Sequence, residues 1–232
     1  MSAIAIITAR GGSKRIPRKN IRPFLGRPMI AWPIGAALES GVFDRVVVST
    51  DDPDIAAVAR AAGAEVPALR PSDLADDYAP AHKAARHMLE LLRETDPAIR
   101  HFCHIYPTAP LLSADLLRQG MERLRGGGFR SLWAVVPVPY PVFQLMGASG
   151  SGSLYRLFPD DKAAMRSQDM PQSYVDVGQA YFFEVDHFLE HELALGEHTG
   201  LIEVPPDSAV DIDTEEDWIR AERIATRLAA EG

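Results

Sequence analysis

The sequence predicts an α/β fold with a mostly parallel β-sheet and flanking helices. Short runs rich in β-branched and aromatic residues alternate with segments of helical period, which is typical of parallel strands joined by crossover helices. The 232 residues, 47% hydrophobic and 24% charged, are enough to bury a substantial core. We therefore expect a single domain that spans residues 1–232.

The expected elements follow from apolar runs for strands and from period 3.6 for helices. Pro33 must kink the first helix or mark its true start, because a proline ring does not fit inside a helix. Asp52 is placed to cap the second helix and Gly63 to end it, whereas Pro67 restricts its segment to a sheet edge. The expected strands are residues 4–8, 45–50, 64–69, 101–106, 131–138, 179–185 and 201–204, and the expected helices are residues 28–40, 52–63, 82–94, 113–125, 187–192 and 214–230.

The alternation stops between residues 140 and 172. This segment has a Gly/Ser-rich tip, "GASGSGS", which suits a hairpin, and it contains no βα repeat. We expect an insertion that covers a site or meets a second subunit.

Composition excludes several classes of function. A formal net charge of -8 argues against binding to nucleic acid or to a membrane surface. The one cysteine, Cys103, lies in an apolar run and is expected to be a buried thiol. No apolar run approaches the ~20 residues of a membrane span, and the N-terminal run is too short for a secretory signal. We expect a cytoplasmic protein.

Six cations and no acid lie between Arg10 and Arg22, directly after the first expected strand. The pair Gly11 and Gly12 would let backbone N–H groups approach an anion, while Lys and Arg side chains supply compensating charge. The spacing is neither a P-loop nor a dinucleotide motif. A solvated basic loop that pairs with distant acids is the alternative, but ligands of open α/β sheets bind at strand ends. The position therefore favours phosphate binding.

Two carboxylates lie close together in "VDIDTEEDW" near the C-terminus. In an extended segment Asp211 and Asp213 point to one side, which suits a hard divalent cation such as the Mg²⁺ that accompanies a nucleoside triphosphate. The alternative is a capping box, in which Asp213 or Thr214 caps the last helix and Glu216 or Asp217 completes the box.

Five segments carry a family resemblance when they are read in order: "ARGGSKRIPRKNI", "VVVSTDD", "LRPSDLADD", "YPTAP" and "DIDT". Together they resemble the nonulosonate cytidylyltransferases, which couple CTP to sialic-acid-like sugars, over nearly the whole chain. "YPTAP" and "RSQDMPQSYVDVGQAYF" are most similar to the pseudaminic acid cytidylyltransferases, since sialic acid enzymes typically carry Gln where this chain has Tyr106. The chain departs from that group at "PVFQLM", where an arginine is expected near Gln144.

The resemblance implies a Rossmann-like nucleotidyltransferase fold and a homodimer whose insertion reaches across the interface. It also implies Mg²⁺-dependent transfer of CMP from CTP to the anomeric hydroxyl of the sugar. Together with the loop chemistry, it assigns catalysis to Lys19, Arg10 and Asp211; nucleotide binding to Arg10, Gly11, Gly12, Ser13, Lys14, Lys19, Asn20 and Arg70; sugar binding to Tyr106, Arg166, Gln168, Gln179 and Tyr181; and Mg²⁺ binding to Asp211 and Asp213.

Some alternatives stay open at this level. The general base is not identifiable, because Asp211, Asp213 and a metal-bound hydroxide could each serve. The sugar could be sialic or legionaminic acid, and a noncatalytic nucleotide-binding module is a further possibility. His187 and His191 stand four apart on an expected helix, for which a solvated face is favoured over a zinc site.

Overall fold

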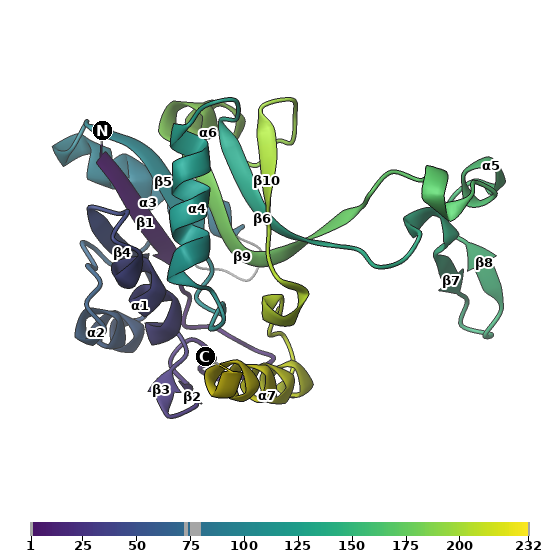
Figure 1. Cartoon of the computed structure of the whole chain (residues 1–232). Helices are drawn as coiled ribbons and strands as arrows, with labels where there is room; N and C mark the ends of the chain where they lie inside the picture. Colours follow the sequence, from purple (N-terminus) through teal and green to yellow (C-terminus); the bar gives the residue numbers. More distant parts are fainter. Residues whose placement is uncertain (1, 72–73, 75–79, 232) are drawn as a thin grey trace.

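A six-stranded sheet forms the centre of the computed structural model, which describes residues 2–71, 74 and 80–231 (Figure 1). Its strands are β1 (Ser2–Thr8), β4 (Arg45–Ser49), β5 (Ile99–Ile105), β6 (Ser131–Pro137), β9 (Tyr174–Glu184) and β10 (Thr199–Glu203). The order across the sheet is β10-β6-β9-β5-β1-β4. Only β9 runs antiparallel to its two neighbours, whereas the other adjacent pairs in this sheet are parallel. The predicted α/β class and mostly parallel sheet are confirmed.

Helices cover both faces of the sheet, and each face buries its own apolar core. The helices are α1 (Ala31–Ser40), α2 (Pro53–Ala61), α3 (Ala81–Thr95), α4 (Ala114–Arg125) and α6 (Val185–His191). Ile34, Ile55 and Met121 place α1, α2 and α4 in one core, while Met88 and Phe188 place α3 and α6 in the other. No helix in the described part of the chain is both long enough and apolar enough to span a bilayer.

A third apolar cluster packs residues of the N-terminal loop and hairpin against residues of the C-terminal segment. The C-terminal helix α7 (Glu215–Glu231) lies beside the hairpin of β2 (Pro23–Phe24) and β3 (Arg27–Pro28) (Figure 1). Ile16 of the cationic loop, Phe24, Ile212 and Trp218 are all buried in this cluster. Burial of Ile16 and Ile212 together holds the cationic loop against the segment that carries Asp211 and Asp213, although the two are far apart in sequence.

Three of the expected elements differ most from those observed. Helix α1 begins at Ala31, because residues 27–28 pair in β3, and Pro33 lies in the first turn, where its missing N–H breaks no helical bond. Residues 64–69 make two isolated bridges to the β4 edge, at Glu65 and Leu69, rather than a continuous strand. Strand β9 begins at Tyr174 rather than at residue 179, because it also pairs with the end of β6. Asp52 caps α2 as predicted.

The expected insertion leaves the sheet between β6 and β9 and projects away from it (Figure 1). We call residues 138–173 the arm. It contains the hairpin of β7 (Met146–Ala148) and β8 (Leu154–Arg156), the short helix α5 (Asp160–Ala163) and two 3₁₀ turns, at Val142–Gln144 and Ser167–Asp169. The Gly/Ser-rich tip connects the two hairpin strands, as predicted.

Candidate active site

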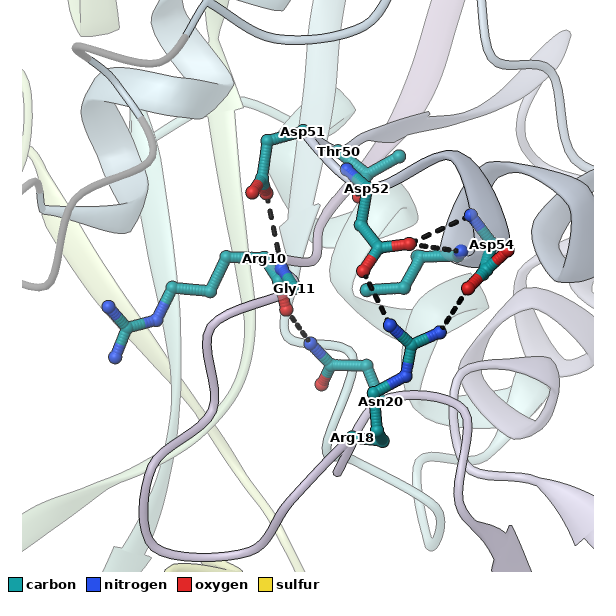
Figure 2. Close-up of polar contacts among 9 residues, drawn as sticks. Arg10, Gly11, Arg18, Asn20, Thr50, Asp51, Asp52 and Asp54 are labelled. Atoms are coloured by element: carbon teal, nitrogen blue, oxygen red, sulfur yellow. Dashed lines mark hydrogen bonds and ion pairs between the residues drawn. The ribbon is translucent and has the colours of Figure 1, made fainter.

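The cationic loop leaves the C-terminal end of β1 and is fixed to the neighbouring strand end by backbone contacts. Ala9 N–H donates to the Ser49 carbonyl (2.9 Å), and Gly11 N–H donates to Asp51 Oδ1 (3.2 Å). Where the loop returns, Asn20 Nδ2 donates to the Arg10 carbonyl (2.9 Å), which closes the loop on itself (Figure 2). The conformation of the loop is therefore set by the protein before any ligand binds.

Gly11 has a structural use that the sequence did not reveal. A Cβ atom at this position would lie 2.6 Å from Asp52 Oδ2, so only glycine fits where the loop passes the start of α2. Its N–H group is also taken by Asp51. Gly11 and Gly12 do not line the cavity described below, and the expectation that Gly11 N–H faces an anion is not met in this conformation.

Two of the six loop cations pair with acids away from the cavity. Arg18 bridges Asp52 (2.9 Å) and Asp54 (2.7 Å), and Figure 2 shows this fork on the opposite side of the loop from the Arg10 guanidinium. Arg22 pairs with Glu215 of α7 and stacks over the Trp218 ring. For these two arginines the alternative reading, pairing with distant acids, is the correct one.

The remaining loop cations line a cavity of about 520 Å³ at the end of β1. Of the predicted nucleotide-binding residues, the structure brings six to this cavity: Arg10, Ser13, Lys14, Lys19, Asn20 and Arg70. Arg15, Thr8 and Tyr106 also contribute to its wall. A cavity with five Lys or Arg side chains and no Asp or Glu among its described lining residues is suited to a polyphosphate.

Arg70 enters this cavity from a buried position. Its backbone N–H donates to the Thr50 carbonyl, and its guanidinium pairs with Asp51 at 3.2 Å. Burial lowers the pKa of Arg70, and the Asp51 charge opposes this shift. Arg70 Nε is buried and has no hydrogen-bond partner among the described residues. An unpaired buried donor is costly, so Arg70 has a hydrogen-bonding capacity that the described residues leave unused, although the Nε atom itself is buried.

A second cavity, of about 370 Å³, adjoins the first and shares three of its wall residues, Lys19, Tyr106 and Thr108. Its other lining residues are Asp176, Gly178, Tyr181, Asp211 and Asp213. The two cavities thus differ in charge, since one is cationic and the other carries three carboxylates. Lys19 stands at their junction.

Lys19 connects the loop to the C-terminal carboxylates. Its Nζ donates to the Ile212 carbonyl and lies 3.5 Å from Asp213 Oδ1, while Arg15 pairs with Asp213 Oδ2 at 2.8 Å. Asp213 does not cap α7. Thr214 and Asp217 form the capping box, because Asp217 N–H donates to Thr214 Oγ1 and Thr214 N–H donates to Asp217 Oδ2. The Asp213 carboxylate is left to face the cavity.

The carboxylate pair fits a divalent cation. Asp211 and Asp213 line the same cavity with buried Ile212 between them, which is the one-sided geometry expected of an extended segment. Partial desolvation raises the pKa of Asp211, and the neighbouring Asp213 charge raises it further. Lys19 and Arg15 offset part of this negative charge, and a bound cation would relieve the rest. No group of three or more His, Cys, Asp or Glu suited to a metal occurs in the described part of the chain. A hard cation held by one or two carboxylates commonly completes its coordination with water and substrate oxygens.

The predicted sugar-binding residues are only partly brought together. Tyr106 and Tyr181 line the second cavity, with ring centroids 5.7 Å apart. Gln179 is buried instead and donates to the Ser208 carbonyl (2.6 Å), so it ties β9 to the segment before Asp211. Arg166 and Gln168 lie on the arm, where Arg166 pairs with Asp169, and neither lines the cavity in a single chain.

Asp176 is a cavity residue that sequence reasoning missed. Its carboxylate accepts hydrogen bonds from the Tyr181 hydroxyl, at 2.9 and 2.7 Å to its two oxygens. The signal was present, since Asp176 lies in the segment "SYVDVGQAYF" that carried the resemblance, but nothing in its spacing marked it. The solvated face predicted for the histidine pair is wrong for His187, which is buried, and holds for His191, which is exposed.

Comparison with solved structures defines the class of protein by its fold. The chain superimposes on CMP:2-keto-3-deoxy-manno-octonic acid synthetase in complex with CTP (TM-score 0.72, 15% identity, 98% of this chain and 100% of that chain). It also matches 4-diphosphocytidyl-2C-methyl-D-erythritol synthase from Anaerococcus prevotii (TM-score 0.67, 14% identity, 97% and 96% of the two chains). The implied nucleotidyltransferase fold is confirmed.

Sequence comparison then gives the family. Residues 4–139 match the cytidylyltransferase family model, and the chain belongs to this family. It is 38% identical over 217 residues to a pseudaminic acid cytidylyltransferase from Campylobacter jejuni (94% of this chain, 93% of the relative). It is 31% identical to the CMP-N,N'-diacetyllegionaminic acid synthase of Legionella pneumophila, over 97% of this chain and 96% of the relative. It is 33% identical to an N-acylneuraminate cytidylyltransferase of Oncorhynchus mykiss, over 97% of this chain and 50% of the relative. The resemblance inferred from the motifs is confirmed.

Proposed function

We propose that this enzyme transfers CMP from CTP to the anomeric hydroxyl of a nonulosonic acid, and that pseudaminic acid is its preferred sugar. The anomeric oxygen attacks the α-phosphorus, the bond from that phosphorus to the β-phosphate oxygen breaks, and pyrophosphate leaves. The observation that carries the proposal is the junction at Lys19, where a cationic cavity opens into an acidic one.

The division of charge supports specific roles in this reaction. Arg10, Ser13, Lys14 and Asn20 would hold the triphosphate, and the guanidinium of Arg70 would donate to the nucleotide. Lys19 at the junction would stabilise the charge that develops during transfer. Phosphoryl-type transfer depends mainly on such positioning and charge stabilisation rather than on covalent help from the protein.

We propose Mg²⁺ as the cation at Asp211 and Asp213. When bound, it would neutralise phosphate charge and polarise the reacting phosphoryl group. Mg²⁺ commonly binds one or two protein carboxylates together with substrate phosphates, and the carboxylate pair beside the cationic cavity suits that mode. Asp211 and Asp213 are also the candidates to accept the proton of the sugar hydroxyl.

We propose further that the protein is a homodimer in which the arm packs against a second copy. The arm exposes large apolar side chains, including Met146, Leu154 and Leu157, far from the sheet. Such a surface is typical of a protein interface. This arrangement also suits Arg166 and Gln168, which do not reach the cavity of their own chain. Light scattering on the purified chain tests the dimer. The single domain and the cytoplasmic location stay predictions.

Pyrophosphate release with each of the four common nucleoside triphosphates against pseudaminic, legionaminic and sialic acids tests the proposal. CTP with pseudaminic acid should be the best pair. A sugar epimer that leaves cavity donors or acceptors unpaired loses about 1–3 kcal/mol for each, or roughly tenfold to a few hundredfold. Equal or faster turnover of sialic acid under the same conditions would contradict the choice of sugar but not the cytidylyltransferase reaction.

A further inference from the structure

Strand β9 carries an irregularity beside the second cavity. Its pairing with β6 shifts register between Trp133 and Val135, and Gly178 at this point has φ +59°, a left-handed conformation that favours glycine. Strand bulges occur next to active sites, where they redirect a side chain. The side chain that this irregularity redirects is Asp176.

The core packing shows the change of face. Val177, Ala180 and Phe182 all belong to the same apolar core, although 177 and 180 are an odd number of residues apart. In a regular strand such residues face opposite sides. The irregularity at Gly178 therefore brings the side chains of Asp176 and Tyr181 to one side of the sheet, where they meet.

The Asp176 carboxylate is held in one orientation by two donors. Gly178 N–H donates to Oδ1 (2.9 Å), and the Tyr181 hydroxyl lies 2.9 Å from Oδ1 and 2.7 Å from Oδ2. The Tyr181 side chain is itself fixed, because it is only 4% exposed and packs edge-on against Trp133. Burial raises the pKa of Tyr181, with contributions from Tyr106 and Asp176, so its hydroxyl stays protonated and remains a donor.

The chemistry of the second cavity limits what Asp176 can bind. Asp176 is exposed to the cavity, so its carboxylate is accessible to a ligand. Asp176 and Asp211 line the same cavity, and a Cβ atom on Gly178, which donates to Asp176, would lie 4.0 Å from Asp211 Cγ. A fixed carboxylate in an acidic cavity repels the carboxylate of a nonulosonic acid but accepts hydrogen bonds from its hydroxyl and acylamido N–H groups.

We propose that Asp176 is a sugar-binding, specificity-determining residue, which accepts hydrogen bonds from hydroxyl or acylamido N–H groups of the nonulosonic acid, and that Tyr181 is the positioning residue that holds it. This inference rests on the proposed function. A fixed acceptor distinguishes epimers, because only one arrangement of ring substituents directs its donors toward the carboxylate.

The test compares the wild type with Asp176→Asn and Tyr181→Phe in steady-state pyrophosphate release, with sugar and CTP varied separately. Asp176→Asn keeps the side-chain shape and loses the charge. Since hydrogen bonds to charged groups are the strong ones, KM for the sugar should rise about tenfold to a hundredfold. KM for CTP and kcat should change by less than about threefold, because the nucleotide occupies the other cavity. The preference for pseudaminic over sialic acid should shrink.

Tyr181→Phe should raise KM for the sugar by a smaller factor than Asp176→Asn. In the double variant, KM for the sugar should rise by less than the product of the two single increases, because both changes act on one carboxylate. The matched control is Glu190→Gln on α6, an exposed carboxylate that lines neither cavity and should behave as the wild type. Circular dichroism verifies folding of each variant.

Two results would overturn the inference while leaving the proposed function intact. An unchanged sugar KM in folded Asp176→Asn would remove Asp176 from recognition. A loss in kcat alone, with an altered pH profile, would assign a proton-transfer role instead. A wild type that turns over no nonulosonic acid would overturn the proposed function itself and the sugar role of Asp176 with it, so the two failures are distinguishable.

Discussion

Replacement of Lys19 by alanine is the most direct test of the junction between the two cavities. Lys19 is the only Lys or Arg among the described residues that lines both of them, and its Nζ contacts the segment that carries Asp211 and Asp213. In Lys19→Ala the triphosphate would keep Arg10, Lys14, Arg15 and Arg70, so ground-state binding of CTP should largely persist. The charge on the transferring phosphoryl group would lose the cation at the junction of the two cavities.

The size of the effect follows from the kind of interaction that is removed. A preorganised donor that acts on charge developing in a transition state is worth about 2.7–4 kcal/mol, which corresponds to roughly a hundredfold to a thousandfold in kcat. The Ile212 carbonyl and Asp213 also lose the Nζ contact, although Arg15 still pairs with Asp213. We therefore expect kcat to fall by about a hundredfold or more, with a moderate loss of stability and a folded protein.

The assay is pyrophosphate release at saturating CTP and sugar, with Arg18→Ala as the matched control. Arg18 belongs to the same loop and carries the same charge, but it pairs with Asp52 and Asp54 and lines neither cavity. Its removal should cost stability and leave kcat within a few-fold of the wild type. The reasoning is refuted if folded Lys19→Ala turns over at a near-normal rate, or if Arg18→Ala loses as much kcat.

Two further predictions concern the carboxylates and the loop. The pKa of Asp211 is raised in the folded protein, so the ionised carboxylate disfavours folding. Asp211→Asn should therefore increase the free energy of unfolding at neutral pH in EDTA. This gain should vanish as the pH falls below the ordinary aspartate range, because the carboxyl group is then protonated in both states. The same variant should need more Mg²⁺ for half-maximal activity; an unchanged Mg²⁺ titration would contradict metal binding. Gly11→Ala should lower the free energy of unfolding by about 1–3 kcal/mol, measured by thermal or urea unfolding. Gly12→Ala should leave it nearly unchanged, because the added Cβ would meet no atom within 4 Å. Equal losses in the two variants would argue against the steric explanation.

Local chemistry made much of the fold predictable. Asp52 accepts from the N–H groups of Asp54 and Ile55 at the start of α2, as its position before Pro53 indicated. Alternation of apolar runs and helical segments gave the sheet because each pattern has its own period. The start of α1 was wrong because the β2-β3 hairpin depends on a pairing between residues that periodicity does not register.

The candidate site was predictable where a motif kept its residues together, and not where tertiary contacts decide. Charge alone grouped Arg18 with Lys19, yet Arg18 turns to Asp52 because its own φ is +56° and α2 begins beside it. The sequence could not show that Gly11 N–H is used by Asp51, since the two lie on different strand ends. The motif "LRPSDLADD" lies largely outside the described residues, apart from Leu69, Arg70, Pro71 and Leu74.

The two cavities explain why the loop contains several cations and no acid. A segment that holds phosphate must carry several cations, but those cations repel one another unless acids elsewhere in the chain balance them. Arg22 and Arg18 are balanced by Glu215 and by the acids at the start of α2, and these pairs fix the C-terminal part of the loop. Lys19 lies between these two arginines and contacts the Ile212 carbonyl at the cavity junction, while Ile16 of the same loop is buried in one cluster with Ile212. An acid inside the loop would have neutralised the cavity it was meant to charge, and this explains why the balancing carboxylates come from distant segments.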